Sequence, residues 1–241
     1  MAESKQPERM GKKLVIVSGS YGSGKTEFAI NLAVKARHEE KGRVLLVDLD
    51  VVNPYFRSRD VREEFTAKGI DVVAPEGSFS HADLPMLSPR VGGAITDTDA
   101  TVILDAGGDP AGARVLARYR EDIEKRGYLL WLIANTRRPA TRTAQEIGAM
   151  MDAISTISGL GFTGIVANSH LMEETSPEII REGASVASQV ALDRGLRFEF
   201  VCVSERLMGK EALAGLGAPV LILSRYMKKP WEIGAGVHHR I

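Results

Sequence analysis

The sequence predicts a three-layer α/β/α fold built on a mainly parallel sheet, and three observations lead to this prediction. Short apolar runs alternate with helical patterns along the 241 residues, as in βαβ units. Most of these runs are continuous stretches of Val, Ile and Leu, which is typical of parallel strands buried on both faces. A glycine-rich turn joins the first strand to the first helix, and acidic residues follow two later strands.

Eight short apolar segments are predicted to be strands. They are Lys13–Ser18, Arg43–Asp48, Asp71–Ala74, Thr101–Asp105, Tyr128–Ala134, Gly164–Asn168, Phe198–Val203 and Val220–Leu223. A helix is expected over Thr26–Glu39, directly after the glycine-rich turn, and other helices fit between the later strands. The segment Pro75–Thr98 interrupts this alternation and is longer than an ordinary connection, which predicts a functional loop or lid.

Two later helices have recognisable start signals. One is expected to begin near Pro139, a residue type favoured in the first turn, and its apolar positions advance by threes and fours. Those positions are Ala140, Ala144, Ile147, Met151, Ile154 and Ile157 or Ser158. The other is expected to open with a capping box between Thr175 and Glu178, with Pro177 in the first turn. Its apolar stripe consists of Ile180, Ala184, Ala187 and Ala191.

Composition limits the classes of protein that need consideration. Lys plus Arg and Asp plus Glu both total 31, so no excess charge points to nucleic acid or to an acidic membrane surface. Residues 1–12 are polar and are expected to form a disordered tail before a single domain over residues 13–241. No secretory signal or membrane-spanning stretch is expected, which predicts a cytoplasmic protein.

Cysteine and histidine usage excludes two further kinds of site. The one cysteine, Cys202, lies in an apolar strand, so an intramolecular disulfide framework is not expected. The histidines lack any spacing with acids or cysteines that is typical of a metal centre.

The glycine-rich turn is the strongest motif of the chain. Residues 19–26 read Gly-Ser-Tyr-Gly-Ser-Gly-Lys-Thr and fit G-x-x-x-x-G-K-[ST], between a strand and a helix as that motif requires. Such a loop directs backbone N–H groups and the positive end of a helix at phosphate oxygens. Lys25 is then expected to reach the β- and γ-phosphates, and the Thr26 hydroxyl to bind Mg²⁺. The motif predicts a nucleoside triphosphate as ligand.

A second element follows the strand Thr101–Asp105. Asp105 ends that strand at the ligand edge of the predicted sheet, so we expect it to hold Mg²⁺ through water together with Thr26. This requires the two strands that carry these residues to be neighbours. Gly107 and Gly108 leave the backbone free to approach a γ-phosphate. Asp109 is expected to cap a helix that starts near Pro110.

A third element is the pair of acids at the end of Arg43–Asp48. Side chains alternate along a strand, so Asp48 and Asp50 are expected to project the same way, toward the γ-phosphate. Two carboxylates this close require a cation between them or a raised pKa.

Together the three elements resemble the SIMIBI class of phosphate-loop NTPases, in particular the nucleotide-binding family that includes MinD, ParA and CobQ/CobB-type domains. The likeness covers roughly Lys13 to Leu223 and implies a P-loop NTPase fold with ATP chemistry. It implies that Asp50 is the second acid of a D-x-D motif and orients the hydrolytic water, and that residues 105–108 form Walker B and switch II. Residues 135–139 resemble the N-x-x stretch before a dimer-facing helix, which implies a nucleotide-dependent homodimer.

The chain departs from MinD and ParA at one position of the loop. Those proteins have a lysine that acts across the dimer where this chain has Ser20. The resemblance therefore does not extend to a trans-acting lysine. Arg137, Arg138 and Arg142 are alternative sources of a cation.

The resemblance also bears on the choice of base. Asn168 ends a strand where relatives use an asparagine amide to contact the purine, and guanine-specific members place an aspartate three residues later. Leu171 occupies that position here and cannot accept hydrogen bonds, which favours ATP over GTP. Residues 204–206 are a candidate for the other wall of the base site.

The leading hypothesis is a Mg²⁺-dependent ATPase that acts as a nucleotide switch for an unidentified protein partner. The predicted catalytic residues are Lys25, Asp50 and Asp48, and the predicted metal ligands are Thr26, Asp105 and Asp50. The predicted nucleotide-binding residues are Gly19, Ser20, Gly22, Ser23, Gly24, Lys25, Thr26, Glu27, Gly108 and Asn168.

Two other functions remain open at this stage. The first is an ATP-dependent kinase or ligase for a small acidic molecule, with Arg57 and Arg59 pointing into a pocket closed by Pro75–Thr98. Exposed Tyr55 and Phe56 would instead favour partner binding. The second is a nucleotide-binding module without turnover.

Overall fold

The computed structural model describes residues 13–39, 42–50, 59–74, 89–207 and 215–227. Within these residues, eight strands form one sheet in the order β3-β2-β4-β1-β5-β6-β7-β8. Every neighbouring pair in it is parallel. The strands are β1 (Leu14–Ser18), β2 (Arg43–Asp48), β3 (Ile70–Val73), β4 (Ala100–Asp105), β5 (Leu129–Ala134), β6 (Gly164–Ala167), β7 (Arg197–Ser204) and β8 (Val220–Leu223). The predicted parallel sheet is confirmed.

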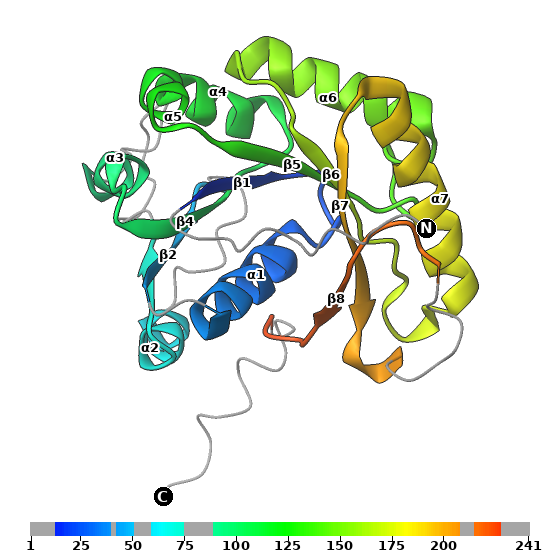
Figure 1. Cartoon of the computed structure of the whole chain (residues 1–241), viewed down its shortest axis with the longest axis horizontal. Helices are drawn as coiled ribbons and strands as arrows, with labels where there is room; N and C mark the ends of the chain where they lie inside the picture. Colours follow the sequence, from blue (N-terminus) through cyan, green and yellow to red (C-terminus); the bar gives the residue numbers. More distant parts are fainter. Residues whose placement is uncertain (1–12, 40–41, 51–58, 75–88, 208–214, 228–241) are drawn as a thin grey trace, which may run out of the picture.

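Helices cover both faces of the sheet (Figure 1). They are α1 (Lys25–Glu39), α2 (Arg59–Ala67), α3 (Pro89–Thr96), α4 (Pro110–Arg118), α5 (Arg120–Arg126), α6 (Ala144–Ser158) and α7 (Pro177–Arg194). Two short 3-10 turns, η2 (Met172–Glu174) and η3 (Glu205–Leu207), follow β6 and β7. Helices α1 and α2 pack on one face and α3 to α7 on the other, so the predicted three-layer α/β/α fold is confirmed.

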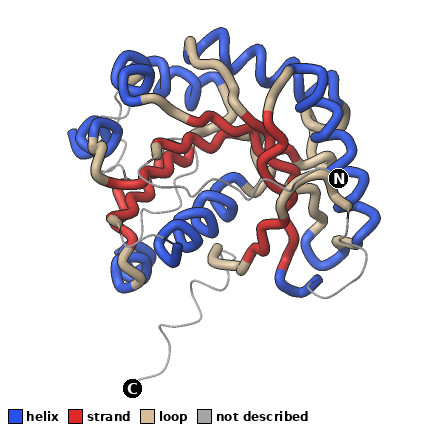
Figure 2. The backbone as a smooth tube through the Cα atoms, viewed as in Figure 1, coloured by secondary structure: helices blue, strands red, loops and turns tan. Residues whose placement is uncertain are grey.

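The strands form a band between the helical layers (Figure 2). Their side chains alternate between the two faces of the sheet. In β1, Val15 and Val17 pack in the core beneath α1, whereas Leu14 and Ile16 pack in the core on the opposite face. All four are buried, which explains why the strand is apolar at every position. Cys202 is also buried, as predicted.

Helix α6 begins one turn later than predicted. Its first residue is Ala144, and Thr143 caps it in a capping box with Glu146. The predicted start near Pro139 is wrong because Ala140 has a φ of 64°, in the left-handed region that a right-handed helix cannot include. The predicted apolar face is confirmed from Ile147 onward, where Met151, Ile154 and Ser158 are also buried.

Helix α7 has a different cap from the predicted one. Ser176 is the capping residue, and its side chain accepts the N–H of Ile179. The Thr175 hydroxyl is already engaged, because it donates to the Met172 carbonyl and accepts the N–H of Leu171. The predicted capping box with Glu178 is therefore wrong. The predicted apolar stripe of Ile180, Ala184, Ala187 and Ala191 is buried.

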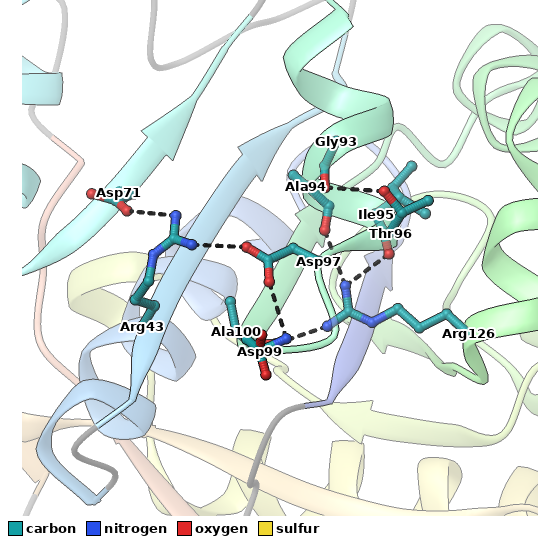
Figure 3. Close-up of polar contacts among 10 residues, drawn as sticks. All are labelled: Arg43, Asp71, Gly93, Ala94, Ile95, Thr96, Asp97, Asp99, Ala100 and Arg126. Atoms are coloured by element: carbon teal, nitrogen blue, oxygen red, sulfur yellow. Dashed lines mark hydrogen bonds and ion pairs between the residues drawn. The ribbon is translucent and has the colours of Figure 1, made fainter.

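The segment predicted as a long loop contains helix α3. Residues 75–88 lie outside the described residues, but Pro89–Thr96 is helical, so the prediction of a loop or lid is wrong for this part. Arg126 holds the end of the helix: its guanidinium donates to the carbonyls of Ala94, Ile95 and Ala100 (Figure 3). A side chain distant in the sequence thus satisfies carbonyls that a helix end leaves unpaired.

The same region ties together strands β2 and β3. Arg43 ion-pairs with Asp71 and with Asp97, across the end of the sheet where these strands begin (Figure 3).

Among the described residues, no helix has the length and apolar character needed to cross a membrane.

Candidate nucleotide-binding site

The glycine-rich loop follows the central strand β1, which lies between β4 and β5. The strands β2, β3 and β4, which follow β1 in the sequence, all lie on one side of it in the sheet. The chain then crosses to the other side, where β5 lies next to β1. The carboxyl end of β1 is therefore the point where the strand order reverses, and ligands of open parallel sheets bind at such a point. As predicted, the strands that carry Asp105 and the loop are direct neighbours.

The conformation of the loop depends on glycine. Gly22 has a φ of 75° and Gly24 a φ of 83°, in the region that favours glycine. The Ser23 N–H donates to the Ser20 carbonyl over 3.0 Å, which closes a tight turn before α1. The hydroxyl oxygens of Ser20 and Ser23 are buried and have no hydrogen-bond partner among the described residues. Buried donors without partners at a helix N-terminus suit an anionic ligand.

The turn after β4 touches the loop closely because of Gly108. A β-carbon placed on Gly108 would lie 2.2 Å from the carbonyl oxygen of Gly19. Gly19 itself has no room for a side chain, because its β-carbon would lie 2.7 Å from the Ile133 carbonyl oxygen. The backbone after β4 is therefore in contact with the loop, where it can respond to a change in it. Asp109 caps α4 by accepting the N–H of Gly112, as predicted.

Thr26 and Asp105 face one another at the start of α1. The Thr26 hydroxyl donates to Oδ2 of Asp105 over 2.6 Å. Oδ1 of Asp105 is buried and has no hydrogen-bond partner among the described residues. Burial raises the pKa of Asp105 to about 6, against the opposing effect of Lys25. A hydroxyl and a buried carboxylate with a free oxygen are the donors that Mg²⁺ prefers, so these residues fit the predicted metal.

Lys25 and Asp50 form a buried ion pair. The Lys25 Nζ lies 2.7 Å from Oδ2 of Asp50, and Oδ1 of Asp48 accepts the N–H of Asp50 over 3.0 Å. Burial by itself would lower the pKa of Lys25, but the charges of Asp105, Asp50 and Asp48 outweigh it and raise that pKa. The structure thus brings the two predicted acids to the loop, where Asp48 orients the backbone of Asp50 and Asp50 pairs with the lysine.

Two carboxylates contact the first residues of α1: Asp105 bonds to Thr26, and Asp50 pairs with Lys25. Among the described residues no group of three or more His, Cys, Asp and Glu side chains is arranged to hold a metal ion. Asp50 is engaged by Lys25, which leaves Thr26 and Asp105 as the protein ligands that the geometry favours.

Polar side chains from the turns after β5 and β6 contact the opposite flank of the loop. The Asn168 amide donates to the Ser23 carbonyl over 2.8 Å, and Nε of Arg138 donates to the Gly22 carbonyl over 3.2 Å. A β-carbon on Gly24 would lie 2.3 Å from Nδ2 of Asn168 and 3.3 Å from Nε2 of His170. Burial, with a smaller effect of Arg138, lowers the pKa of His170.

The contribution of His170 was not predicted from the sequence. Asn135 at the end of β5 holds it, since its side chain accepts the His170 N–H and donates to the His170 carbonyl. The available signal was that the turns after the neighbouring strands β5 and β6 both carry asparagine, at Asn135 and Asn168.

Glu27 was predicted to contact the nucleotide, but its carboxylate is engaged elsewhere. It accepts the N–H groups of Tyr226 and Met227, after β8, over 2.6 and 3.1 Å. Burial raises the pKa of Glu27 against these hydrogen bonds. The Glu27 carboxylate therefore attaches the segment after β8 to α1, and the contact of Glu27 with a nucleotide stays a prediction.

The structure separates the three arginines that were alternative cations. Arg137 ion-pairs with Glu182, and Arg142 is exposed. Only Arg138 reaches the loop.

Of the candidate base-site residues, Glu205 accepts a hydrogen bond from Ser224 and Arg206 donates to the Met172 carbonyl. Residues 51–58, which include Tyr55, Phe56 and Arg57, lie outside the described residues, as does the side chain of Arg59.

A groove of about 300 Å³ opens beside the Gly108 turn, between α4 and α6. Most of its lining is apolar, and its charged members are the acids Asp109 and Glu146. Both acids are hydrogen-bonded as helix-capping groups.

The fold and this loop define a phosphate-loop nucleotide-binding protein. Residues 14–193 match the family model of the CobQ/CobB/MinD/ParA nucleotide binding domain, which is designated CbiA. The match covers well over half of the chain, and the chain belongs to this family. A search of curated proteins found no match.

Solved structures of low sequence identity resemble the chain. The cell division protein FtsY of Thermotoga maritima is 18% identical with a TM-score of 0.51, over 82% of this chain and 64% of that one. FtsY of Mycoplasma mycoides is 16% identical with a TM-score of 0.48, over 80% and 60%. A nucleotide-binding protein of Archaeoglobus fulgidus in complex with ADP is 16% identical with a TM-score of 0.43, over 79% and 82%. The chain thus spans less than two thirds of either FtsY, and the T. maritima protein supports the fold alone.

Proposed function

We propose that this protein is a Mg²⁺-dependent ATPase that acts as a nucleotide switch. The observation that carries the proposal is the convergence of Lys25, Thr26, Asp50 and Asp105 on one end of the glycine-rich loop. These are a phosphate-binding cation, two oxygen donors for a metal and a carboxylate able to orient water, which phosphoryl transfer to water requires.

Each side chain has a distinct task in this proposal. Thr26 and Asp105 hold the metal through the hydroxyl and the free carboxylate oxygen. Bound Mg²⁺ would neutralise negative charge that develops on the phosphates. Lys25 transfers its contact from Asp50 to the phosphates, which are stronger competitors because of their higher charge. Asp50 is then released to accept a hydrogen bond from the attacking water, while Asp48 holds its backbone.

The contact of Gly108 with Gly19 supports a switch. A ligand that reorders the loop displaces the turn at the start of α4, and the groove between α4 and α6 changes with it. The exposed aromatic ring of Tyr21, 82% accessible at the tip of the loop, suits contact with a protein partner or a second copy.

The alternative acceptor, a small acidic molecule, requires a pocket formed by residues 53–59 and the segment 75–98, of which residues 53–58 and 75–88 lie outside the described residues. Water is the acceptor in this proposal because Asp50, once released from Lys25, is able to orient it. ATP is the proposed nucleotide because the side chain of Leu171 offers no hydrogen-bond acceptor for guanine. Leu171 is half-buried and directly follows Ser169 and His170 in the sequence.

A phosphate-release assay with wild type and Lys25→Ala tests turnover, at equal protein concentration with ATP, GTP and EDTA arms. We expect release with ATP and Mg²⁺ that EDTA and the substitution abolish. Wild type that binds ATP without releasing phosphate would instead identify a binding module. Two further experiments test the switch and the homodimer. For the switch, we expect a partner protein to bind only when this protein is loaded with a non-hydrolysable ATP analogue. For the homodimer, gel filtration compares the elution volume with and without that analogue.

A further inference from the structure

The loop has two flanks of different chemistry. On the β4 and β2 side lie Asp105, Asp50 and the Gly108 turn, which contact Thr26, Lys25 and Gly19. On the β5 and β6 side lie Arg138, Asn168 and His170, which contact residues 22–24. Acids therefore occupy one flank, whereas a guanidinium, an amide and an imidazole occupy the other.

This asymmetry orients a bound nucleotide. The proposed metal ligands and the water-orienting acid must lie at the terminal phosphate, which places that phosphate on the β4 side. The nucleoside then extends toward β5 and β6. Arg138 is thus on the wrong flank to replace the missing lysine of the loop at the γ-phosphate.

We propose that Arg138 is a positioning residue for the nucleoside half of the ligand, which rests on the proposed function. Its Nε donates to the Gly22 carbonyl, while Asn168 holds the neighbouring Ser23 carbonyl. With both carbonyls drawn outward, the N–H groups of the loop are directed toward the phosphates. The planar guanidinium, with His170 beside it, forms a wall against which a purine stacks.

The chemistry of this wall suits a purine. A guanidinium stacks on an aromatic face and at the same time donates in its own plane, which a lysine ammonium cannot do. His170 is half-buried against Gly24, and its lowered pKa keeps the imidazole neutral at physiological pH, so that it adds a second planar group without further charge.

The experiment compares affinities for ADP and ATP by titration calorimetry with turnover at saturating ATP. The proteins are wild type, Arg138→Ala, Arg138→Lys and His170→Ala. The control is Arg120→Ala, because Arg120 is an exposed arginine that pairs with Glu124 on α5 and is remote from the loop. Arg138→Ala is expected to weaken ADP and ATP binding by the same factor, about 5- to 30-fold, the usual range for a desolvated cation–π contact. The rise in KM for ATP is expected to exceed any fall in kcat, as for lost uniform binding.

The other variants sharpen the result. Arg138→Lys keeps a cation and a donor but loses the plane, and is expected to remain at least about threefold weaker for both nucleotides. His170→Ala is expected to weaken both nucleotides equally, and Arg120→Ala to leave both unchanged. Should Arg138→Ala fail to fold, the Lys and His170 variants carry the same comparison.

Two results would overturn the inference while leaving the ATPase intact. One is a larger loss for ATP than for ADP with a fall in kcat, which would mean that Arg138 acts on the γ-phosphate. The other is unchanged affinity in the Arg138 variants. Wild type that binds neither nucleotide would refute the proposed function itself, so the two failures are distinguishable.

Discussion

The Lys25 ammonium lies 2.7 Å from the carboxylate of Asp50, which joins the first residue of α1 to the acid that follows β2. Both side chains are almost fully buried, at 11% and 5% exposure. Removal of one partner leaves the other charge buried without compensation, and such changes are strongly destabilising. Substitutions at this pair must therefore be judged by turnover, binding and folding together.

For Lys25→Ala, we expect loss of phosphate release and much weaker ATP binding, because Asp48, Asp50 and Asp105 then face the phosphates without a cation. Lys35→Ala is the matched control, since Lys35 lies on the same helix and pairs at the surface with Glu39. Phosphate release is measured under saturating ATP with circular dichroism to confirm folding. Undiminished release in a folded Lys25→Ala protein would remove the lysine from the mechanism.

Asp50→Asn retains the shape of the side chain and loses its charge. Turnover is expected to fall by about 10²- to 10⁴-fold, the usual contribution of a positioned acid or base. ATP affinity should be kept or improved, because Lys25 no longer has a competing carboxylate. Single-turnover kinetics and calorimetry separate the two quantities. Turnover equal to wild type would show that another group orients the water.

Gly108→Ala tests the contact between the turn after β4 and the loop. The added methyl group would lie 2.2 Å from the Gly19 carbonyl oxygen, so backbone must move and nucleotide binding is expected to weaken at least tenfold. Gly93→Ala is the control, because a β-carbon there meets no atom within 4 Å in helix α3. That change is expected to stabilise the fold by about 0.5–1 kcal/mol. Equal nucleotide affinities in the two variants would contradict the close contact.

Arg126→Ala tests how helix α3 is held. The guanidinium donates to three backbone carbonyls, two of them in α3. Its loss is expected to cost about 2 kcal/mol of unfolding free energy, measured by urea denaturation. Arg120→Ala, at an exposed surface pair, should cost under about 1 kcal/mol. A similar small effect at both positions would mean that α3 does not depend on Arg126.

Cys202 provides a probe of opening and of pH dependence. Burial raises the pKa of its thiol, so a disulfide reagent is expected to label it at neutral pH only when the chain unfolds. Because the folded pKa exceeds the unfolded one, this group's contribution to stability is complete below about pH 8.5 and declines as the pH rises beyond it. Labelling rates and urea midpoints between pH 7 and 10 measure both effects. Rapid labelling of the native protein at pH 7 would contradict the burial.

Much of the architecture was predictable because its signals are local. A run of Val, Ile and Leu indicates a buried parallel strand wherever it lies, and all eight predicted strands are present within a residue or two of their expected bounds. The glycines of the loop are likewise set by a short backbone turn. Helix starts were less predictable. Proline at 139 and threonine at 175 are compatible with a helix start, but Ala140 turns left-handed and Thr175 bonds to η2.

The sequence by itself determined the phosphate-binding loop, the strands around it and the acids at their ends, because spacing and residue type encode these features over a few positions. The tertiary structure alone decided that Lys25 pairs with Asp50, that Glu27 holds the segment after β8, and that Arg138, not Arg137 or Arg142, reaches the loop. These contacts join residues far apart in the chain. They depend on the order of strands in the sheet and on the direction each side chain takes from its strand end, and neither is written in a local pattern.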